Sequence, residues 1–172
     1  MEDVLTQRSW APFDVVAPGR RPDRMRSIVS PEGIADRLRS AAMAEIQARD
    51  AFLDAAERFA DRAPLGLIRA WRALASAEDK HLGWLLERLE DLGQEVDGRR
   101  VSAQLFRTLS GCADPERFSR YMAHAETRGM EAGEKFRVRM ADVDPVTARL
   151  FGVVAEEEAD HIRLAHRWFP TA

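Results

Sequence analysis

The chain has 172 residues, of which 45% are hydrophobic and 32% charged, and its formal net charge is −3. This length suits one domain with a sizeable core, and a composition rich in Ala, Leu, Arg and Glu is typical of long amphipathic helices. The slightly acidic balance argues against a surface that binds nucleic acid or an anionic membrane, and the single cysteine, Cys112, excludes an internal disulfide framework.

Targeting and membrane signals are not found in the sequence. The N-terminal stretch MEDVLTQRSW lacks the apolar core of a signal peptide, and no run of about 18 apolar residues follows. One cysteine also fits a reducing compartment. We therefore expect a cytoplasmic protein without a membrane partner.

Residues 1–29 are expected to form an irregular arm ahead of a helical domain over 30–170. Prolines and a glycine interrupt any regular element there, at Pro12, Pro18, Gly19 and Pro22. The arm also carries four arginines: Arg20, Arg21, Arg24 and Arg26. It either lies over the domain or is mobile, and the sequence does not decide between these alternatives.

Four long helices are predicted in the domain. The first begins at Ser30-Pro31-Glu32, where the serine caps the helix and the proline fits its first turn, and it runs to about residue 60. The other three, each bounded by a proline, a glycine or a capping aspartate, are expected over 64–93, 114–141 and 144–169. No alternating pattern predicts strands.

The connections predict how these helices are arranged. Only a few residues separate the first helix from the second, and the third from the fourth, so each pair is expected to form an antiparallel hairpin. A longer stretch between Gly93 and Asp114, with a short helix over 103–109, can carry the chain from one end of a bundle to the other. Two hairpins joined by one long crossover predict an all-α fold, the ferritin-like four-helix bundle.

Four glutamates, one on each long helix, lie on apolar faces. Residues three, four and seven positions apart share a face of a helix. For Glu158 and Glu78 these neighbours are apolar apart from one histidine each. For Glu45 and Glu126 they are mostly small or apolar, which is a weaker signal.

Two of these glutamates belong to Glu-x-x-His motifs, Glu78/His81 and Glu158/His161. One such motif in a Glu-rich protein usually has no meaning, but two that face inward on different helices argue for a shared site. All the candidates lie near the middle of their helices. Because the middles of antiparallel helices coincide, we expect the six side chains to lie in one layer.

Buried carboxylates need compensating positive charge, and four together repel one another. Neither Glu78 nor Glu158 shares its face with a lysine or arginine. Two divalent ions would balance four carboxylates, and two neutral imidazoles would complete the ligands. The predicted metal ligands are Glu45, Glu78, His81, Glu126, Glu158 and His161, a set that suits two iron ions, with manganese or zinc as alternatives.

Several neighbouring residues fit the site less well. Glu157 is expected either to orient a ligand histidine or to be a plain surface glutamate. His124 and His166 are turned away from the ligand faces and are expected at the surface. Trp71 shares the face of Glu78 and is expected to be a core residue, with a pocket or electron-relay role as the alternative; Trp84 is turned further away.

Three segments resemble a known family: HLGWLLERLEDLG, AETRGMEAG and ARLFGVVAEEEADHIRLAHRWF. They are similar to a group of bacterial ferritin-like proteins that is catalogued as a domain of unknown function, over residues 18–169. The resemblance implies a di-iron carboxylate site whose ligands map onto the same six residues. The chain departs from the family pattern beside two ligands. It has Met43-Ala44 where the family often has a histidine shortly before the first ligand glutamate, and Glu157 where the family often has an aspartate directly before the last one. A more distant similarity is to the di-iron hydroxylase that modifies a hypermodified tRNA adenosine.

Three classes of function remain open. The first is an O₂-activating oxidoreductase or oxygenase that acts on a small molecule with an electron donor. The second is iron handling, as a ferroxidase, a storage protein or a peroxide scavenger; a rubrerythrin-like relay with a Cys₄ iron site is excluded by the single cysteine. The third is a helical interaction module in which the metal is structural or absent and the arm is the working part.

A tRNA substrate ranks below a small molecule. Arg99, Arg100 and the arm arginines could contact phosphates, but the net charge is acidic and no long basic stripe is visible. The substrate and the electron donor cannot be named from the sequence. The oligomeric state is open as well, a homodimer included.

Overall fold

A computed structural model describes residues 9–170, and this part of the chain contains five α-helices and no strands. The helices are α1 (Pro31–Arg58), α2 (Leu65–Asp91), α3 (Gln104–Ser110), α4 (Pro115–Met140) and α5 (Pro145–Trp168), with a short 3₁₀ helix, η2 (Val96–Gly98), before α3. The all-helical prediction is confirmed, including the short helix in the long connection. Within residues 9–170, none of the helices combines the length and hydrophobicity that a membrane span requires.

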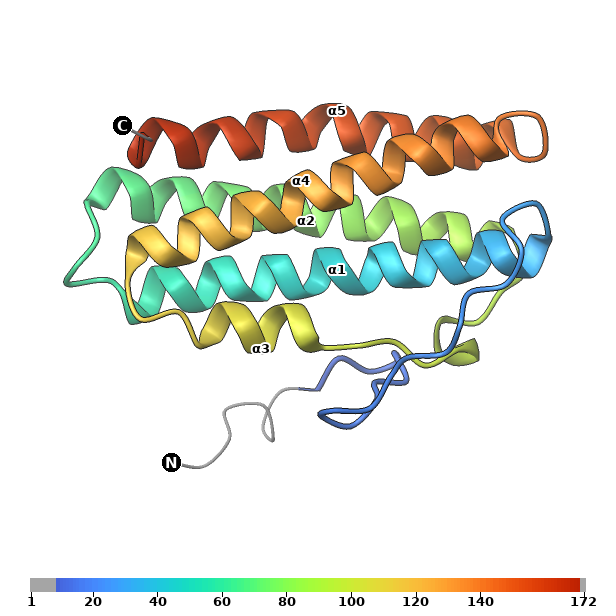
Figure 1. The fold of residues 1–172 in the computed structure, drawn as a ribbon, viewed down its shortest axis with the longest axis horizontal. Helices are drawn as coiled ribbons and strands as arrows, with labels where there is room; N and C mark the ends of the chain where they lie inside the picture. Colours follow the sequence, from blue (N-terminus) through green and yellow to red (C-terminus); the bar gives the residue numbers. More distant parts are fainter. Residues whose placement is uncertain (1–8, 171–172) are drawn as a thin grey trace.

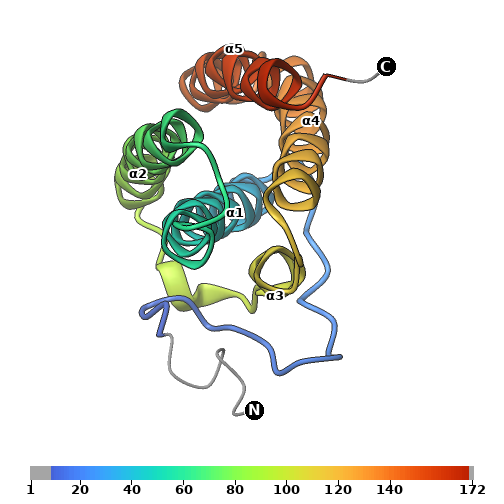
Figure 2. The ribbon, with the colours of Figure 1, turned by 90° about the vertical axis from the view of Figure 1, so that its left-hand side faces the viewer.

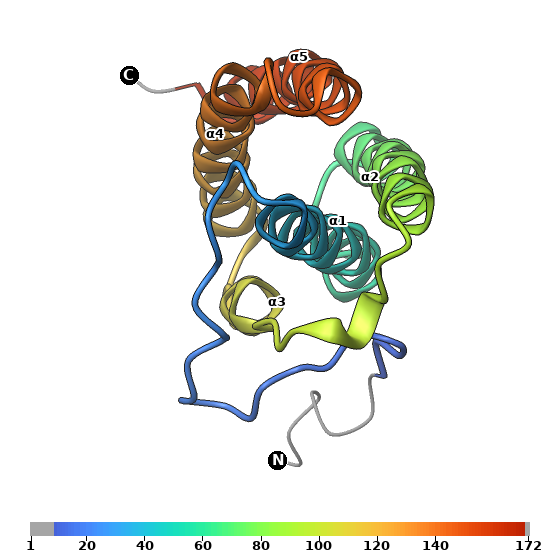
Figure 3. The same ribbon diagram turned by 90° about the vertical axis from the view of Figure 1, so that its right-hand side faces the viewer.

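The four long helices pack as two antiparallel hairpins, α1 with α2 and α4 with α5 (Figure 1). Contacts within each hairpin are far more extensive than the contacts of α2 with α5 or of α1 with α4. The end views show the two hairpins facing each other, with α3 outside them beside α1 (Figures 2 and 3). This arrangement is compatible with the predicted four-helix bundle.

Side chains cap three of the long helices as their sequences predict. The capping oxygen accepts a hydrogen bond from the backbone N–H three residues further on, which satisfies one of the free donors of the first turn. These pairs are Ser30 with Gly33, Asp114 with Arg117, and Asp144 with Thr147. The starts of α1, α4 and α5 are therefore encoded locally, before any packing between helices.

Helix α2 ends at a glycine whose conformation other residues adopt with strain. Gly93 has a φ of +65°. Its N–H donates to the carbonyl of Glu90 at 2.8 Å, and the N–H of Gln94 donates to the carbonyl of Leu89 at 3.1 Å. This pair of bonds is the Schellman motif, which ends a helix and turns the chain away.

Asp144 is the cap with the most buried contacts. Its carboxylate accepts hydrogen bonds from the Thr147 hydroxyl at 2.5 Å and from Arg88 Nη2 at 3.0 and 3.1 Å. We expect Asp144→Ala to lower the free energy of unfolding by about 2–4 kcal/mol, because it removes the cap and the closest ion pair of Arg88. Urea denaturation measures this, and Asp142→Ala, an exposed residue in the same turn, is the matched control.

The contribution of Asp144 to the free energy of unfolding depends on pH. Burial alone would raise the pKa of Asp144, but the hydrogen bonds from Thr147 and Arg88 outweigh it and hold that pKa below its usual value. The stabilisation is therefore present above the unfolded-state pKa of about 3.9 and is lost as the pH falls through the lower folded-state pKa. The difference between wild type and Asp144→Ala should shrink in acid, and a constant difference would contradict this assignment.

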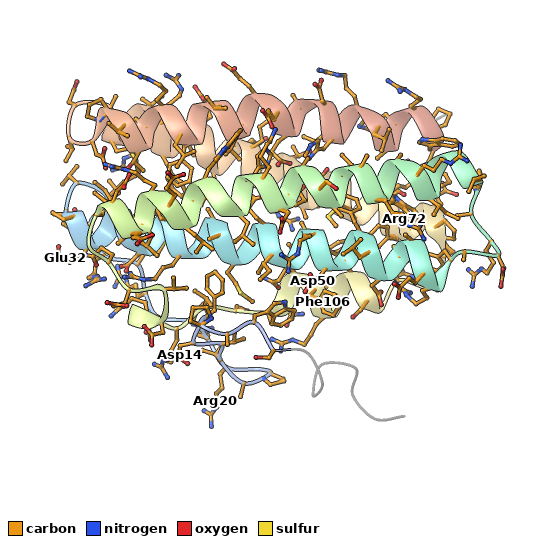
Figure 4. All side chains as sticks on the ribbon, turned by 180° about the vertical axis from the view of Figure 1, so that it is seen from behind. Asp14, Arg20, Glu32, Asp50, Arg72 and Phe106 are labelled. Carbon is orange, nitrogen blue, oxygen red and sulfur yellow. The ribbon has the colours of Figure 1, made fainter. Side chains whose placement is uncertain are left out.

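The described part of the arm, residues 9–29, lies against the helices. Trp10 packs edge-on against Phe106 of α3 at 5.4 Å and donates to the carboxylate of Asp50 on α1 at 2.9 Å. Val15 forms an isolated parallel bridge with Val101 of the long connection. Figure 4 labels Asp50 and Phe106, and shows Arg20 pointing away from the helices. Residues 1–8 of the predicted arm lie outside the described residues.

Candidate metal centre

The six side chains predicted to bind metal meet between the four long helices. Glu45 comes from α1, Glu78 and His81 from α2, and Glu126 from α4, each near the middle of its helix. α5 supplies the last two, Glu158 and His161. All are buried except Glu45, whose side chain is 12% exposed. Each lies on the apolar stripe of an amphipathic helix, so burying that stripe also buries the carboxylate or imidazole.

Their ligand atoms form two overlapping groups. Glu45, Glu78, His81 and Glu158 each offer an atom within 4.8 Å of the others, and so do Glu78, Glu126, Glu158 and His161. Glu78 and Glu158 belong to both groups, so their carboxylates lie between the two. The cluster could hold a metal ion, and carboxylate with imidazole ligands does not by itself select which metal.

Both imidazoles present Nδ1 to the carboxylates. His81 Nδ1 lies 3.3 Å from Glu158 Oε1 and 3.6 Å from Glu45 Oε2. His161 Nδ1 lies 3.0 Å from Glu78 Oε1 and 3.5 Å from Glu158 Oε2. The two rings are stacked, with their centroids 5.8 Å apart. The nitrogens therefore face one shared volume.

Most of these side chains contain a buried polar atom without a hydrogen-bond partner. The atoms are Glu78 Oε1, His81 Nδ1, Glu126 Oε1, Glu158 Oε1 and His161 Nδ1. Leaving one buried polar atom unpaired costs about 1–3 kcal/mol, and more when the group is charged. Cations among these atoms would satisfy them together, so the residues fit a metal site.

Without a cation, protons reduce the repulsion within the cluster. Burial, with repulsion from neighbouring carboxylates, raises the pKa of Glu45 and of Glu126. Burial opposes charge on Glu78 too, but the close contacts of its carboxylate with Glu45 and both histidines lower its pKa to about 2. Burial lowers the pKa of each histidine, but close contacts with Glu158 and neighbouring glutamates raise the pKa of His81 to about 12 and that of His161 to about 10.

Glu157 contacts the cluster from outside. Its Oε2 lies 2.8 Å from His81 Nε2 and accepts a hydrogen bond from Lys80 Nζ at 2.6 Å. A carboxylate on the far nitrogen of a ligand histidine fixes the orientation and tautomer of the ring. The contact is the geometry that the first of the two alternatives for this residue, orientation of a histidine, requires.

Trp71 lies in the core as expected, whereas Trp84 lies nearer the cluster than its helical angle to Glu78 suggests. Trp71 packs against Phe118 and Phe59, with ring centroids 5.3 and 6.2 Å away, and is a core residue. Trp84 lies 5.7 Å from the His81 ring, under the Lys80 ammonium. Its spacing of three from His81, rather than its angle to Glu78, was the signal in the sequence. His124 and His166 are exposed, as predicted.

A cavity of about 330 Å³ adjoins the cluster, between α1 and α4. The four glutamates line one part of it. Most of the remaining lining is small or apolar, and the small residues include Ala41, Ala44, Ala48, Ala125, Gly129 and Gly133. Sequence reasoning missed this cavity, although the small residues on the Glu126 face were its signal.

Comparisons with known proteins place the chain in a family. No solved structure matches it. A Haemophilus influenzae protein, described as uncharacterized, is 26% identical over 180 residues, which cover 97% of this chain and 62% of that protein. The chain thus spans less than two thirds of the length of this relative. A family model described as "Protein of unknown function (DUF455)" matches residues 7–172, and the chain therefore belongs to that family.

Proposed function

We propose that this chain is a ferritin-like oxidoreductase that uses two iron ions to activate O₂ for oxidation of a small molecule. The observation that carries the proposal is the sharing of Glu78 and Glu158 by two groups of ligand atoms. Two shared carboxylates, with one further glutamate and one histidine on each side, suit a pair of adjacent ions. Four carboxylates and two divalent ions are also neutral together.

The residues of the chain have distinct roles in this proposal. Glu45 and His81 would complete the ligands of one ion, and Glu126 and His161 those of the other. When bound, the iron pair supplies the electrons that reduce O₂. Glu157 holds the His81 ring in place, and the surrounding apolar faces leave most of the cluster buried.

The cavity favours a small-molecule substrate over iron handling. Its mostly apolar lining reaches the four glutamates, whereas a path for hydrated iron ions is expected to be polar. The arm gives little support to a tRNA substrate, because two of the candidate phosphate ligands already have partners. Arg26 pairs with Asp36 at 2.7 Å, and Arg100 pairs with Asp23 at 2.7 Å.

Metal analysis with an O₂ reaction tests this function. Protein from iron-replete cells should contain about two iron ions per chain, and anaerobic titration with Fe²⁺ should saturate at the same ratio. When the iron-loaded protein is exposed to O₂, it should consume O₂ in one rapid turnover. Continued rapid oxidation of excess Fe²⁺ would favour a ferroxidase instead, and binding of less than one ion would contradict a two-ion centre.

The contact of Glu157 with His81 predicts a graded effect. We expect Glu157→Gln to weaken binding of Fe²⁺ by about 10–100-fold, because the amide orients the imidazole without supporting its charge. Competition with a chelator measures the affinity. Glu156→Gln, the exposed neighbour in the same glutamate run, should bind as wild type does. Equal affinities for both variants would show that Glu157 is only a surface residue.

A further inference from the structure

The cavity beside the glutamates exists because two helix faces carry small residues opposite each other. On α1 the facing residues are alanines one turn apart, and on α4 they are alanines and glycines. At Gly129 an added Cβ would meet no atom within 4 Å. Larger side chains at these positions would close the space, so the small residues leave room for a bound molecule beside the glutamates.

The positively charged side chain of Arg37 lies at the end of the cavity that is remote from Glu45. Arg37 and Phe136 line this end, with the guanidinium 5.6 Å from the ring centroid. Slightly more than two turns of α1, about 12 Å, separate Arg37 from Glu45. The lining residues Met25 and Gly129 are exposed, so the cavity is open to solvent.

One nitrogen of the Arg37 guanidinium has no hydrogen-bond partner. Its Nη1 donates to the carbonyls of Arg26 and Gly33 at 2.9 and 2.7 Å, but its Nε is buried and has no partner. Among residues 9–170, no carboxylate lies within ion-pair distance of it. Burial lowers the pKa of the guanidinium, Asp36 opposes this, and the positive charge of Arg139 adds to it. An anion would supply both the missing acceptor and the missing charge.

We infer that this cavity binds an apolar monocarboxylate, with its carboxylate at Arg37 and its carbon chain extending towards the glutamates. A distance of about 12 Å corresponds to a chain of about ten bonds, at roughly 1.2 Å of extension for each bond. That the ligand is also the substrate rests on the proposed function; its binding does not. An arginine is suited to this head group because it offers several N–H donors to one carboxylate.

Calorimetric titration with decanoate, and with decanol as the uncharged analogue, tests the inference. Decanoate should bind at least about tenfold more tightly than decanol, because only the acid pairs with Arg37. Arg37→Gln should remove this difference. Gly129→Leu should weaken both ligands by at least about tenfold by filling the cavity. Gly83→Leu is the matched control, since Gly83 is exposed on α2 and its added Cβ also meets no atom.

Three results would overturn the inference: equal affinities of wild type for decanoate and decanol, a preference for decanoate that persists in Arg37→Gln, or unchanged binding in Gly129→Leu. The titrations are made with metal-free and with iron-loaded protein. If the protein fails to bind two ions but still binds decanoate, the proposed function is wrong and the inference stands. If it binds two ions but shows no preference for decanoate, the inference is wrong and the proposed function stands.

Discussion

Glu78→Ala should remove both metal ions, whereas Glu126→Ala should remove one. Glu78 contributes to both groups of ligand atoms, and Glu126 contributes to only one of them. The group of Glu45, Glu78, His81 and Glu158 therefore remains intact when Glu126 is lost. We expect affinity in Glu78→Ala to fall by more than about 100-fold for each ion, because even outer partners of ligands cost 10–100-fold.

The stoichiometry of anaerobic Fe²⁺ binding distinguishes these variants. The expected ratios are about two for wild type, one for Glu126→Ala and none for Glu78→Ala. Glu87→Ala, an exposed glutamate on the same helix as Glu78, should retain both ions. If Glu78→Ala fails to fold by circular dichroism, Glu78→Gln tests the same ligand with its volume preserved. Two ions bound to either variant at Glu78 would contradict the shared-ligand assignment.

Metal affinity should rise steeply with pH. Burial and neighbouring charges raise the pKa of Glu45 and Glu126, and the glutamates raise the pKa of both histidines. At pH values below these raised pKa values, the groups hold protons that a metal must displace. The two histidines alone would release about two protons, so the affinity for each ion would rise at least about tenfold per pH unit.

Titration calorimetry in buffers of different ionisation enthalpy counts the released protons. Competition with a chelator at pH 6 and pH 7 measures the affinity directly. Glu126→Gln should release fewer protons than wild type, since it removes one of the titrating groups. Affinity that does not change between these pH values, or uptake of protons on binding, would contradict a protonated metal-free cluster.

The helices and their ligand faces were predictable because their signals are local. Caps such as Ser30 and Asp144 lie next to a proline in the sequence, and their hydrogen bonds span only three residues. The inward glutamates were found by helical spacing alone. The position of the six residues along the bundle axis was predictable as well, because each of them lies near the middle of its helix.

The remaining features depend on pairs that are distant in the sequence. The contact of Glu157 with His81 joins α5 to α2, and its geometry follows from how two helices are rotated against each other. The position of the arm depends on Trp10, whose partners lie on α1 and α3. The cavity depends on the distance between α1 and α4. Spacing within one helix carries no information on any of these.

The two hairpins contact each other much less than the helices within each hairpin do. Each hairpin also brings half of the cluster: α1 and α2 supply Glu45, Glu78 and His81, and α4 and α5 supply the other three residues. Bound ions would therefore cross-link the two halves of the molecule. Metal release would then act mainly on the seam between them, so amide exchange should accelerate along the α2–α5 contact while the hairpins themselves stay folded.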